Sequence, residues 1–189
     1  MDDLQVKVMD QKKPFRTDLT AFLGALSLFL STVEYLFPKP VPFFRLGLSN
    51  LPLLVGLDLL NLRELGVLLA LKVAGQALVN GTLASYVFLF SAAGSTASFL
   101  AMVGLHRLTR RIRFLSRQTS LISLSLAGAL ASNTVQVALS IAFIFGPTSG
   151  VIAPLFYGLG TLAGLGVGWL AEIFAQKSQW YKRLRHGQN

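Results

Sequence analysis

Long hydrophobic segments, separated by short polar stretches, make up most of this chain. A helix needs about 20 mostly apolar residues to cross the hydrocarbon core of a bilayer, which is about 30 Å thick. Six segments come close to that length, at residues 19–37, 44–60, 64–82, 83–105, 121–145 and 151–175. The pattern therefore predicts an all-α fold, an integral membrane bundle of six transmembrane helices.

The same pattern divides the chain into one membrane domain and two short tails. Residues 1–18 and 177–189 are polar and basic, whereas residues 19–176 hold the hydrophobic segments. The second of these segments contains Asn50 and Pro52, which interrupt a regular apolar helix. We therefore expect that segment to be broken, tilted or partly re-entrant.

The positive charges lie next to the ends of the hydrophobic segments. Of the 17 Lys and Arg side chains, most fall in three blocks, within residues 7–16, 107–117 and 177–185. Because positively charged loops stay in the cytoplasm, this distribution predicts cytoplasmic termini in a multi-pass protein of the inner (plasma) membrane. The expected partners of these blocks are anionic lipid headgroups rather than nucleic acid, despite the net charge of +9.

The composition argues against an enzyme. Cysteine is absent, so disulfides and thiolate chemistry are excluded. The chain has no Gly-rich phosphate-binding loop followed by Lys and Ser or Thr, and no convincing Ser–His pair. The hydrophobic segments hold no cluster of carboxylates for magnesium, and both histidines are isolated. We therefore expect a protein without catalytic activity, cofactor or metal site.

Lys72 lies near the middle of the third hydrophobic segment, and Gln76 and Asn80 follow it at helical spacing. Residues at i, i+4 and i+8 share one face of a helix, so these three side chains point the same way. A cation at this depth costs roughly 2.5–3.5 kcal/mol on insertion scales, so it needs a compensating partner. This face is therefore predicted to line a polar site inside the bundle.

Other polar residues of the hydrophobic segments are predicted to converge on the same site. Asn133 and Gln136 are three residues apart and so share a face of the fifth segment. Together these groups would form an outward-facing pocket for a small polar or anionic molecule. Its predicted substrate-binding residues are Glu34, Arg45, Asn50, Lys72, Gln76, Asn80, Asn133 and Gln136. Two alternatives stay open: the groups only bond between helices, or Glu34 pairs with Arg45 or Lys72.

Small residues form a second pattern. Ala21 and Ala25 lie one turn apart near the cytoplasmic end of the first segment, and Gly160, Gly164 and Gly168 form a ladder on the sixth. Small side chains let helices approach closely in membranes. The ladder is predicted to pack inside the bundle, whereas the stripe of Ala21 and Ala25 either packs there or docks a partner.

Two short motifs resemble those of a known family. Residues 45–52, RLGLSNLP, resemble the motif K-L-G-L-A-N-I of the Gx transporter family, also labelled heptaprenyl diphosphate synthase component I. Residues 128–136, GALASNTVQ, resemble its segment G-A-x-A-H-N-x-x-Q, with Ser132 where the family usually has His. The order and spacing of the motifs match, as does the hydropathy plan over nearly the whole chain.

That family is similar to the substrate-binding, or S, components of energy-coupling factor transporters. The resemblance implies a six-helix protein that binds a vitamin-like solute from outside and works with a coupling subunit and two ATPases. It also implies that Ala21 and Ala25, which match an A-x-x-x-A stripe, dock on the coupling subunit. The loop between the first two helices would cover the ligand, which gives Lys39 and Arg45 a reason to lie outside.

The expected function is therefore the solute-binding component of an uptake transporter. The main alternative is a non-catalytic membrane subunit in isoprenoid or quinone (heptaprenyl diphosphate) metabolism. A self-contained carrier driven by an ion gradient is a third possibility, for which Glu34 is the one candidate carboxylate inside the bundle.

Overall fold

The computed structural model describes residues 16–36, 46–79, 81–83, 85–111, 120–146 and 149–186. Within these ranges the chain is helical and has no strand, which confirms the predicted all-α class. The elements are α2 (Thr17–Leu36), η1 (Leu48–Asn50), α3 (Leu51–Leu59), α4 (Leu62–Val79), α5 (Tyr86–Arg111), α6 (Leu121–Ser140), η3 (Ile141–Phe145), α7 (Ser149–Lys177) and α8 (Gln179–His186).

Four of the six predicted spans form helices that are long and apolar enough to cross a membrane. These lie in α2, α5, α6 with most of η3, and α7. The second predicted span forms only η1 and α3, with 3 and 9 residues. At about 1.5 Å per residue, these two elements reach roughly 18 Å, which is less than the bilayer core. The third forms α4, which has 18 residues but carries Arg63, Glu64 and Lys72.

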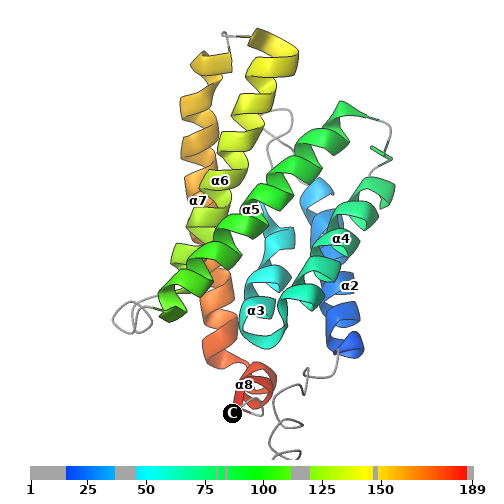
Figure 1. Ribbon diagram of the computed structural model, residues 1–189, viewed down its shortest axis with the longest axis vertical. Helices are drawn as coiled ribbons and strands as arrows, with labels where there is room; N and C mark the ends of the chain where they lie inside the picture. Colours follow the sequence, from blue (N-terminus) through cyan, green and yellow to red (C-terminus); the bar gives the residue numbers. More distant parts are fainter. Residues whose placement is uncertain are drawn as a thin grey trace, which may run out of the picture.

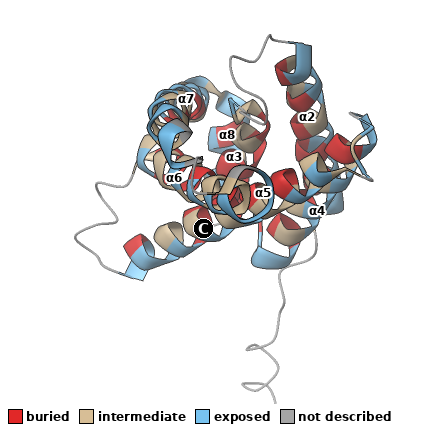
Figure 2. Cartoon of the chain, turned by 90° about the horizontal axis from the view of Figure 1, so that it is seen from above, coloured by how far each residue is buried: buried red, intermediate tan, exposed pale blue. Residues whose placement is uncertain are grey.

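The helices form two groups around the short helix α3. In Figure 1, α6 and α7 lie side by side with α5 crossing them, and α2 and α4 form the other group. The view from above places α3 between the groups (Figure 2). Residues 52–57 of α3 are all buried, which accounts for an apolar helix without an amphipathic pattern. The core therefore surrounds α3, where the two groups meet.

Glycines let α7 approach α6 closely. A β-carbon at Gly164 would lie 2.8 Å from the β-carbon of Ala129, and one at Gly168 would lie 2.6 Å from the Cα of Ile122. Neither position leaves room for a side chain. The ladder on the sixth predicted segment is therefore an internal packing surface, as predicted.

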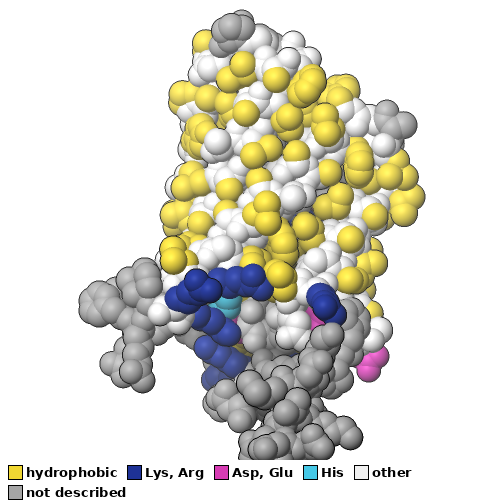
Figure 3. All heavy atoms as spheres, in the orientation of Figure 1, with side chains coloured by type: hydrophobic (Ala, Val, Ile, Leu, Met, Phe, Trp, Pro, Cys, Tyr) yellow, Lys and Arg dark blue, Asp and Glu magenta, His cyan; other side chains and the backbone are white. Residues whose placement is uncertain are grey.

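Charged side chains gather at one end of the molecule. Figure 3 shows Lys and Arg in a band at its lower end, below a surface that is mostly hydrophobic. The start of α2 and the helix α8 both lie at this end (Figure 1). The charge pattern of the sequence thus corresponds to one face of the fold, which we call the basic end.

The short helix α8 adds structure that the sequence analysis left as a tail. Trp180 packs edge-on against Phe22 of α2, with ring centroids 5.7 Å apart. The Tyr181 side chain is buried in the core, and its hydroxyl donates a 2.9 Å hydrogen bond to Oδ2 of Asp58 in α3. The spacing of Trp180, Tyr181 and Leu184 is the amphipathic signal that could have predicted this helix.

Candidate functional site

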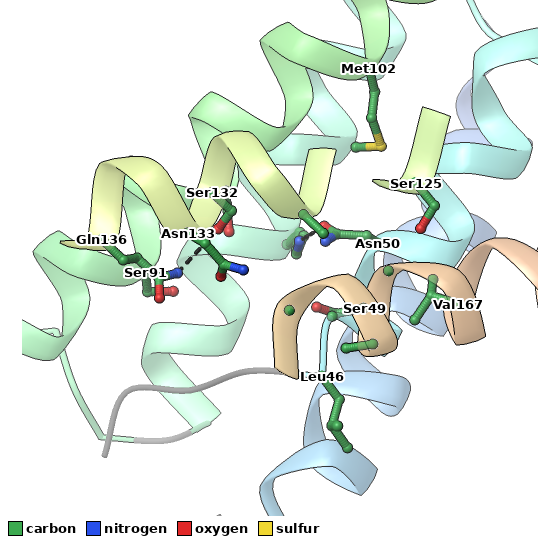
Figure 4. Close-up of a pocket in the computed structure, with 17 residues that line it drawn as sticks. Leu46, Ser49, Asn50, Ser91, Met102, Ser125, Ser132, Asn133, Gln136 and Val167 are labelled. Carbon is green, nitrogen blue, oxygen red and sulfur yellow. Dashed lines mark hydrogen bonds between the residues drawn. The ribbon is translucent and has the colours of Figure 1, made fainter. Parts of the chain in front are cut away.

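A small polar cavity lies where the two helix groups meet. Its volume is about 40 Å³, and its lining residues come from α4, from η1 and the turn before it, and from α5, α6 and α7 (Figure 4). Its lining combines one ammonium group, three side-chain amides and five serine hydroxyls with small and apolar residues. The lining consists of Leu46, Gly47, Ser49, Asn50, Lys72, Ser91, Ser95, Met102, Ser125, Ala129, Ser132, Asn133, Gln136, Gly160, Ala163, Gly164 and Val167.

Lys72 brings a positive charge to this cavity from α4. Its side chain is 2% exposed, and Nζ donates a hydrogen bond to Oδ1 of Asn50. Asn50 stands at the N-cap position of α3, but its side chain makes no capping bond to the helix. The amide is instead used to hold the ammonium, which meets the requirement that a buried cation has a partner.

The chain enters the cavity region through a left-handed turn at Gly47. Its φ is 79°, a conformation that glycine adopts without steric cost. The Gly47 N–H donates to Oε1 of Glu34 at 3.1 Å, and the Ser27 hydroxyl donates to the carbonyl of Ser49 at 2.8 Å. Two side chains of α2 thus fix where η1 and α3 begin. The start of this short helical unit, where a helix carries partial positive charge, therefore borders the cavity that Lys72 also lines.

One face of α6 supplies much of the polar lining. Ser125, Ala129, Ser132, Asn133 and Gln136 recur at the spacing of a single helix face. Asn133 donates from Nδ2 to the carbonyl oxygen of Phe156 in α7 at 3.1 Å. Gln136 donates from Nε2 to the Ser132 hydroxyl at 3.1 Å. The shared face predicted for Asn133 and Gln136 is therefore present, and it points into the cavity (Figure 4).

Two serines of α5 line the cavity next to the polar face of α6 (Figure 4). Ser91 and Ser95 are four residues apart and both border the cavity. Sequence analysis had not assigned them to the site, because serine in a membrane helix equally suits close packing. Gly94 lies between them, and a β-carbon there would come 2.7 Å from the Gln136 amide nitrogen. The close approach of α5 and α6 at Gly94 therefore brings these hydroxyls to the cavity.

The structure brings together part of the predicted substrate-binding set. Asn50, Lys72, Asn133 and Gln136 line the cavity. Glu34 and Gln76 are 4% exposed but do not belong to its lining. Each has one buried side-chain oxygen, Oε2 of Glu34 and Oε1 of Gln76, without a hydrogen-bond partner in the described part of the chain. Arg45 and Asn80 lie outside the described residues.

The predicted docking stripe lies on the outer surface of α2. Ala21 and Ala25 are both exposed, whereas Gly24 between them is buried against Leu68 and Leu71 of α4. The alanines therefore form a small-residue surface that the described chain does not cover. The stripe therefore does not pack inside the described part of the bundle, and docking of a partner there stays a prediction.

The cavity is small for a substrate pocket. A volume of about 40 Å³ holds a few water molecules, since one water needs roughly 10–15 Å³ on this measure. Sites for drug-sized ligands are far larger, at about 300–1,000 Å³. A vitamin-sized solute would thus require the two helix groups to separate.

A family model described as heptaprenyl diphosphate synthase component I matches residues 23–174. The chain belongs to this family. The match runs from within α2 to within α7 and so includes every residue that lines the cavity, whereas α8 lies beyond it. Comparisons with curated proteins and with solved structures give no significant match. No group of three or more His, Cys, Asp or Glu that could hold a metal occurs among the described residues.

Proposed function

We propose that this protein is the solute-binding component of an uptake transporter in the cell membrane. It would bind a small polar or anionic solute in the cavity between the two helix groups. A coupling subunit and ATPases would supply the energy for transport. The observation that carries the proposal is the buried ammonium group of Lys72 at a cavity lined by amides and hydroxyls.

The charges around the cavity favour an anionic or strongly polar ligand. Lys72 supplies an ammonium group, and the start of the η1–α3 unit, the end at which a helix carries partial positive charge, borders the same space. A charged residue within a membrane bundle is costly, and such residues commonly mark substrate or ion pathways. The amides of Asn133 and Gln136 and the serine hydroxyls can direct hydrogen bonds to the remaining polar atoms of a solute.

The two-group architecture supplies a means of opening. Between the two groups the contacts run largely through α3, with a smaller direct contact of α4 with α5, whereas α6 packs closely against both α5 and α7. Separation of α5, α6 and α7 from α2 and α4 would enlarge the cavity without unfolding either group. Closure around the solute would remove it from water and strengthen its interaction with Lys72.

A non-catalytic membrane subunit of isoprenoid diphosphate metabolism is the second candidate. The description of the family favours it, because that description names a component of a heptaprenyl diphosphate synthase. Such a subunit would associate with a soluble enzyme and would need no solute in the cavity. Copurification with a prenyl-transferring enzyme, rather than with ATPases, would select this function.

Mass spectrometry of retained small molecules tests the transport proposal. The full chain is purified in mild detergent from its native membrane, and its solutes are released by denaturation and identified. We expect a stoichiometric polar or anionic solute with the unaltered protein and loss of that solute with Lys72→Met. Removal of the buried charge should leave the fold intact, because the cost of inserting it disappears as well.

The matched control is Lys177→Met, which removes the same charge from an exposed position at the end of α7. Solute retention should be unchanged in this variant. Equal retention by Lys72→Met and by the unaltered protein would remove Lys72 from the site. Absence of any retained solute at all, together with copurification of a prenyl-transferring enzyme, would overturn the transport proposal.

A further inference from the structure

A second pocket lies at the basic end, away from the cavity at Lys72. Its volume is about 160 Å³, four times that of the polar cavity. It is bounded by α8 and by those ends of α3, α5, α6 and α7 that lie at the basic end. Its lining consists of Asp58, His106, Thr109, Arg110, Leu121, Leu124, Glu172, Ala175, Tyr181 and Arg185.

Asp58 organises the charged side of this pocket. Its Oδ1 accepts a 2.9 Å hydrogen bond from Nη2 of Arg110, and its Oδ2 accepts one of 2.9 Å from the Tyr181 hydroxyl. Nε2 of His106 lies 3.6 Å from Oδ1, and Nη2 of Arg185 lies 4.0 Å from Oδ2. One carboxylate thus draws two guanidinium groups from different helices, α5 and α8, to the same pocket.

The two arginines keep donors available after this interaction. Their side chains are 61% and 60% exposed, and each guanidinium has five N–H groups, of which Asp58 occupies few. A guanidinium that is held at one edge by a carboxylate has a fixed orientation, and its other N–H groups can still donate hydrogen bonds to a ligand. Arg110 is held in this way by a hydrogen bond, and Arg185 lies beside the same carboxylate at ion-pair distance. Two neighbouring guanidinium groups suit the tetrahedral oxygens of a phosphate, which arginine binds in bidentate fashion.

Glu172, the other acid of the pocket, has its negative charge compensated within the protein and so does not repel an anion bound at the arginines. Oε2 of Glu172 accepts the N–H of Leu121 at 3.0 Å, at the first turn of α6. Its negative charge is therefore offset by the positive end of that helix. Oε1 of Glu172 accepts a further bond from Gln176 at 3.2 Å. Both acids are occupied within the protein, and the exposed charges that remain at the pocket are positive.

The pocket also has an apolar wall at the edge of the hydrophobic surface. Leu121, Leu124 and Ala175 contribute to its lining. Figure 3 shows the boundary at this end of the molecule, where the hydrophobic surface gives way to Lys and Arg. In a membrane protein this is the level of the lipid headgroups, with acyl chains beside the apolar wall.

We propose that this pocket binds a phosphate group between Arg110 and Arg185, supplied by an anionic phospholipid of the adjacent leaflet. Free inorganic phosphate or diphosphate shares the chemistry and is the other source. The site is independent of solute binding at Lys72, so either proposal can fail without the other. Lipid bound here would join α5 to α8.

Lipid titration followed by native mass spectrometry tests the site. The full chain in detergent is titrated with phosphatidylglycerol, with uncharged diacylglycerol and with inorganic diphosphate. We expect one tightly bound phosphatidylglycerol molecule per protein and no bound diacylglycerol. The double variant Arg110→Gln with Arg185→Gln should bind phosphatidylglycerol about tenfold or more weakly. The control pair Arg107→Gln with Arg111→Gln removes the same charge from exposed positions that do not line the pocket and should change affinity far less.

A second variant keeps the test independent of folding. Arg185→Gln alone leaves the Asp58–Arg110 and Asp58–Tyr181 bonds in place and should still weaken phosphatidylglycerol binding several-fold. Diphosphate binding that is lost in the same variants would support the phosphate site and assign it to free phosphates. Equal losses in the pocket and control pairs, or no binding of either phosphate compound, would overturn the proposal.

Discussion

Gly160 of α7 and Asn133 of α6 fit together so closely that a β-carbon at position 160 would overlap the amide nitrogen of Asn133. The same amide donates to the carbonyl of Phe156, one turn earlier on α7. The absence of a side chain at Gly160 therefore lets Asn133 lie across α7 and reach the cavity wall. One glycine thus determines the position of a candidate substrate-binding residue.

We expect Gly160→Ala to displace the Asn133 amide and to destabilise the protein by about 1–3 kcal/mol, because the hydrogen bond to Phe156 is lost and the helices must move apart. Gly158→Ala is the matched control on the same helix, since nothing lies within 4 Å of a β-carbon there. That control should leave stability unchanged or slightly raised. Thermal unfolding in detergent measures both, and equal effects would contradict the proposed contact.

Glu34 is expected to act mainly as an acceptor that fixes the start of η1. Glu34→Gln keeps an Oε1 acceptor for the Gly47 N–H, whereas Glu34→Ala leaves that N–H without its partner. The alanine variant should therefore be less stable than the glutamine variant by about 1–3 kcal/mol. Chemical unfolding of the two proteins measures this difference. Equal destabilisation would mean that the charge of Glu34, rather than its bond to Gly47, matters at this position.

The exposed stripe on α2 is predicted to dock a partner. Ala21→Trp with Ala25→Trp should prevent copurification of the coupling subunit and ATPases, because large side chains hold the partner helix away. Solute retention should persist, since neither alanine lines the cavity. Gly166→Trp is the control, as position 166 is exposed on α7 with nothing within 4 Å of a β-carbon. Intact assembly of the double variant would exclude this docking surface.

Tyr181 is predicted to hold α8 against the basic end. Tyr181→Phe removes the bond to the Asp58 carboxylate and should weaken α8 docking by about 1.5–3 kcal/mol, the usual range for bonds to charged groups. In a Trp169→Phe background Trp180 is the remaining tryptophan, and its fluorescence reports whether α8 stays packed on Phe22. Arg183→Gln, at an exposed position of the same helix, is the control. Unchanged emission and melting temperature after Tyr181→Phe would contradict this role.

The same helix should respond to alkaline pH. Burial raises the pKa of Tyr181 above its ordinary value, and the charge of Asp58 adds to the effect. Since the pKa is higher when α8 is docked than when it is free, docking is fully favourable below about pH 10 and weakens as pH rises beyond that. Trp180 emission in the Trp169→Phe background should therefore shift above about pH 10. The Tyr181→Phe variant has no phenol to ionise at this position, so its Trp180 emission should lack this shift.

Local spacing made part of the site predictable. Asn133 and Gln136 share a face because they are three residues apart on one helix, whatever surrounds that helix. Lys72 could be expected at an internal polar site because a charge in an apolar segment is costly next to lipid. The glycine ladder of α7 could be assigned to packing for a similar reason. Each of these inferences uses the sequence of a single helix and needs no knowledge of its contacts with the others.

Contacts between helices decided the rest. The serines of α5 line the cavity because Gly94 lets α5 approach Gln136, and Gln76 is left out of the lining although it follows Lys72 by one turn. The docking of α8 depends on Asp58, more than a hundred residues earlier. Similarly, the helical part of the second hydrophobic segment begins after a left-handed turn at Gly47, whose N–H donates to Glu34 of α2.

By itself the sequence determined that the chain is helical and hydrophobic, that its positive charge gathers at segment ends, and which side chains share a helix face. Hydropathy and helical period are local properties of the chain, so they can be read from the sequence without knowing the fold. Which faces meet was decided by the tertiary structure, since that depends on how closely glycines allow helices to approach and where buried polar groups find partners. The pairing of Lys72 with Asn50 is the clearest result of that second kind.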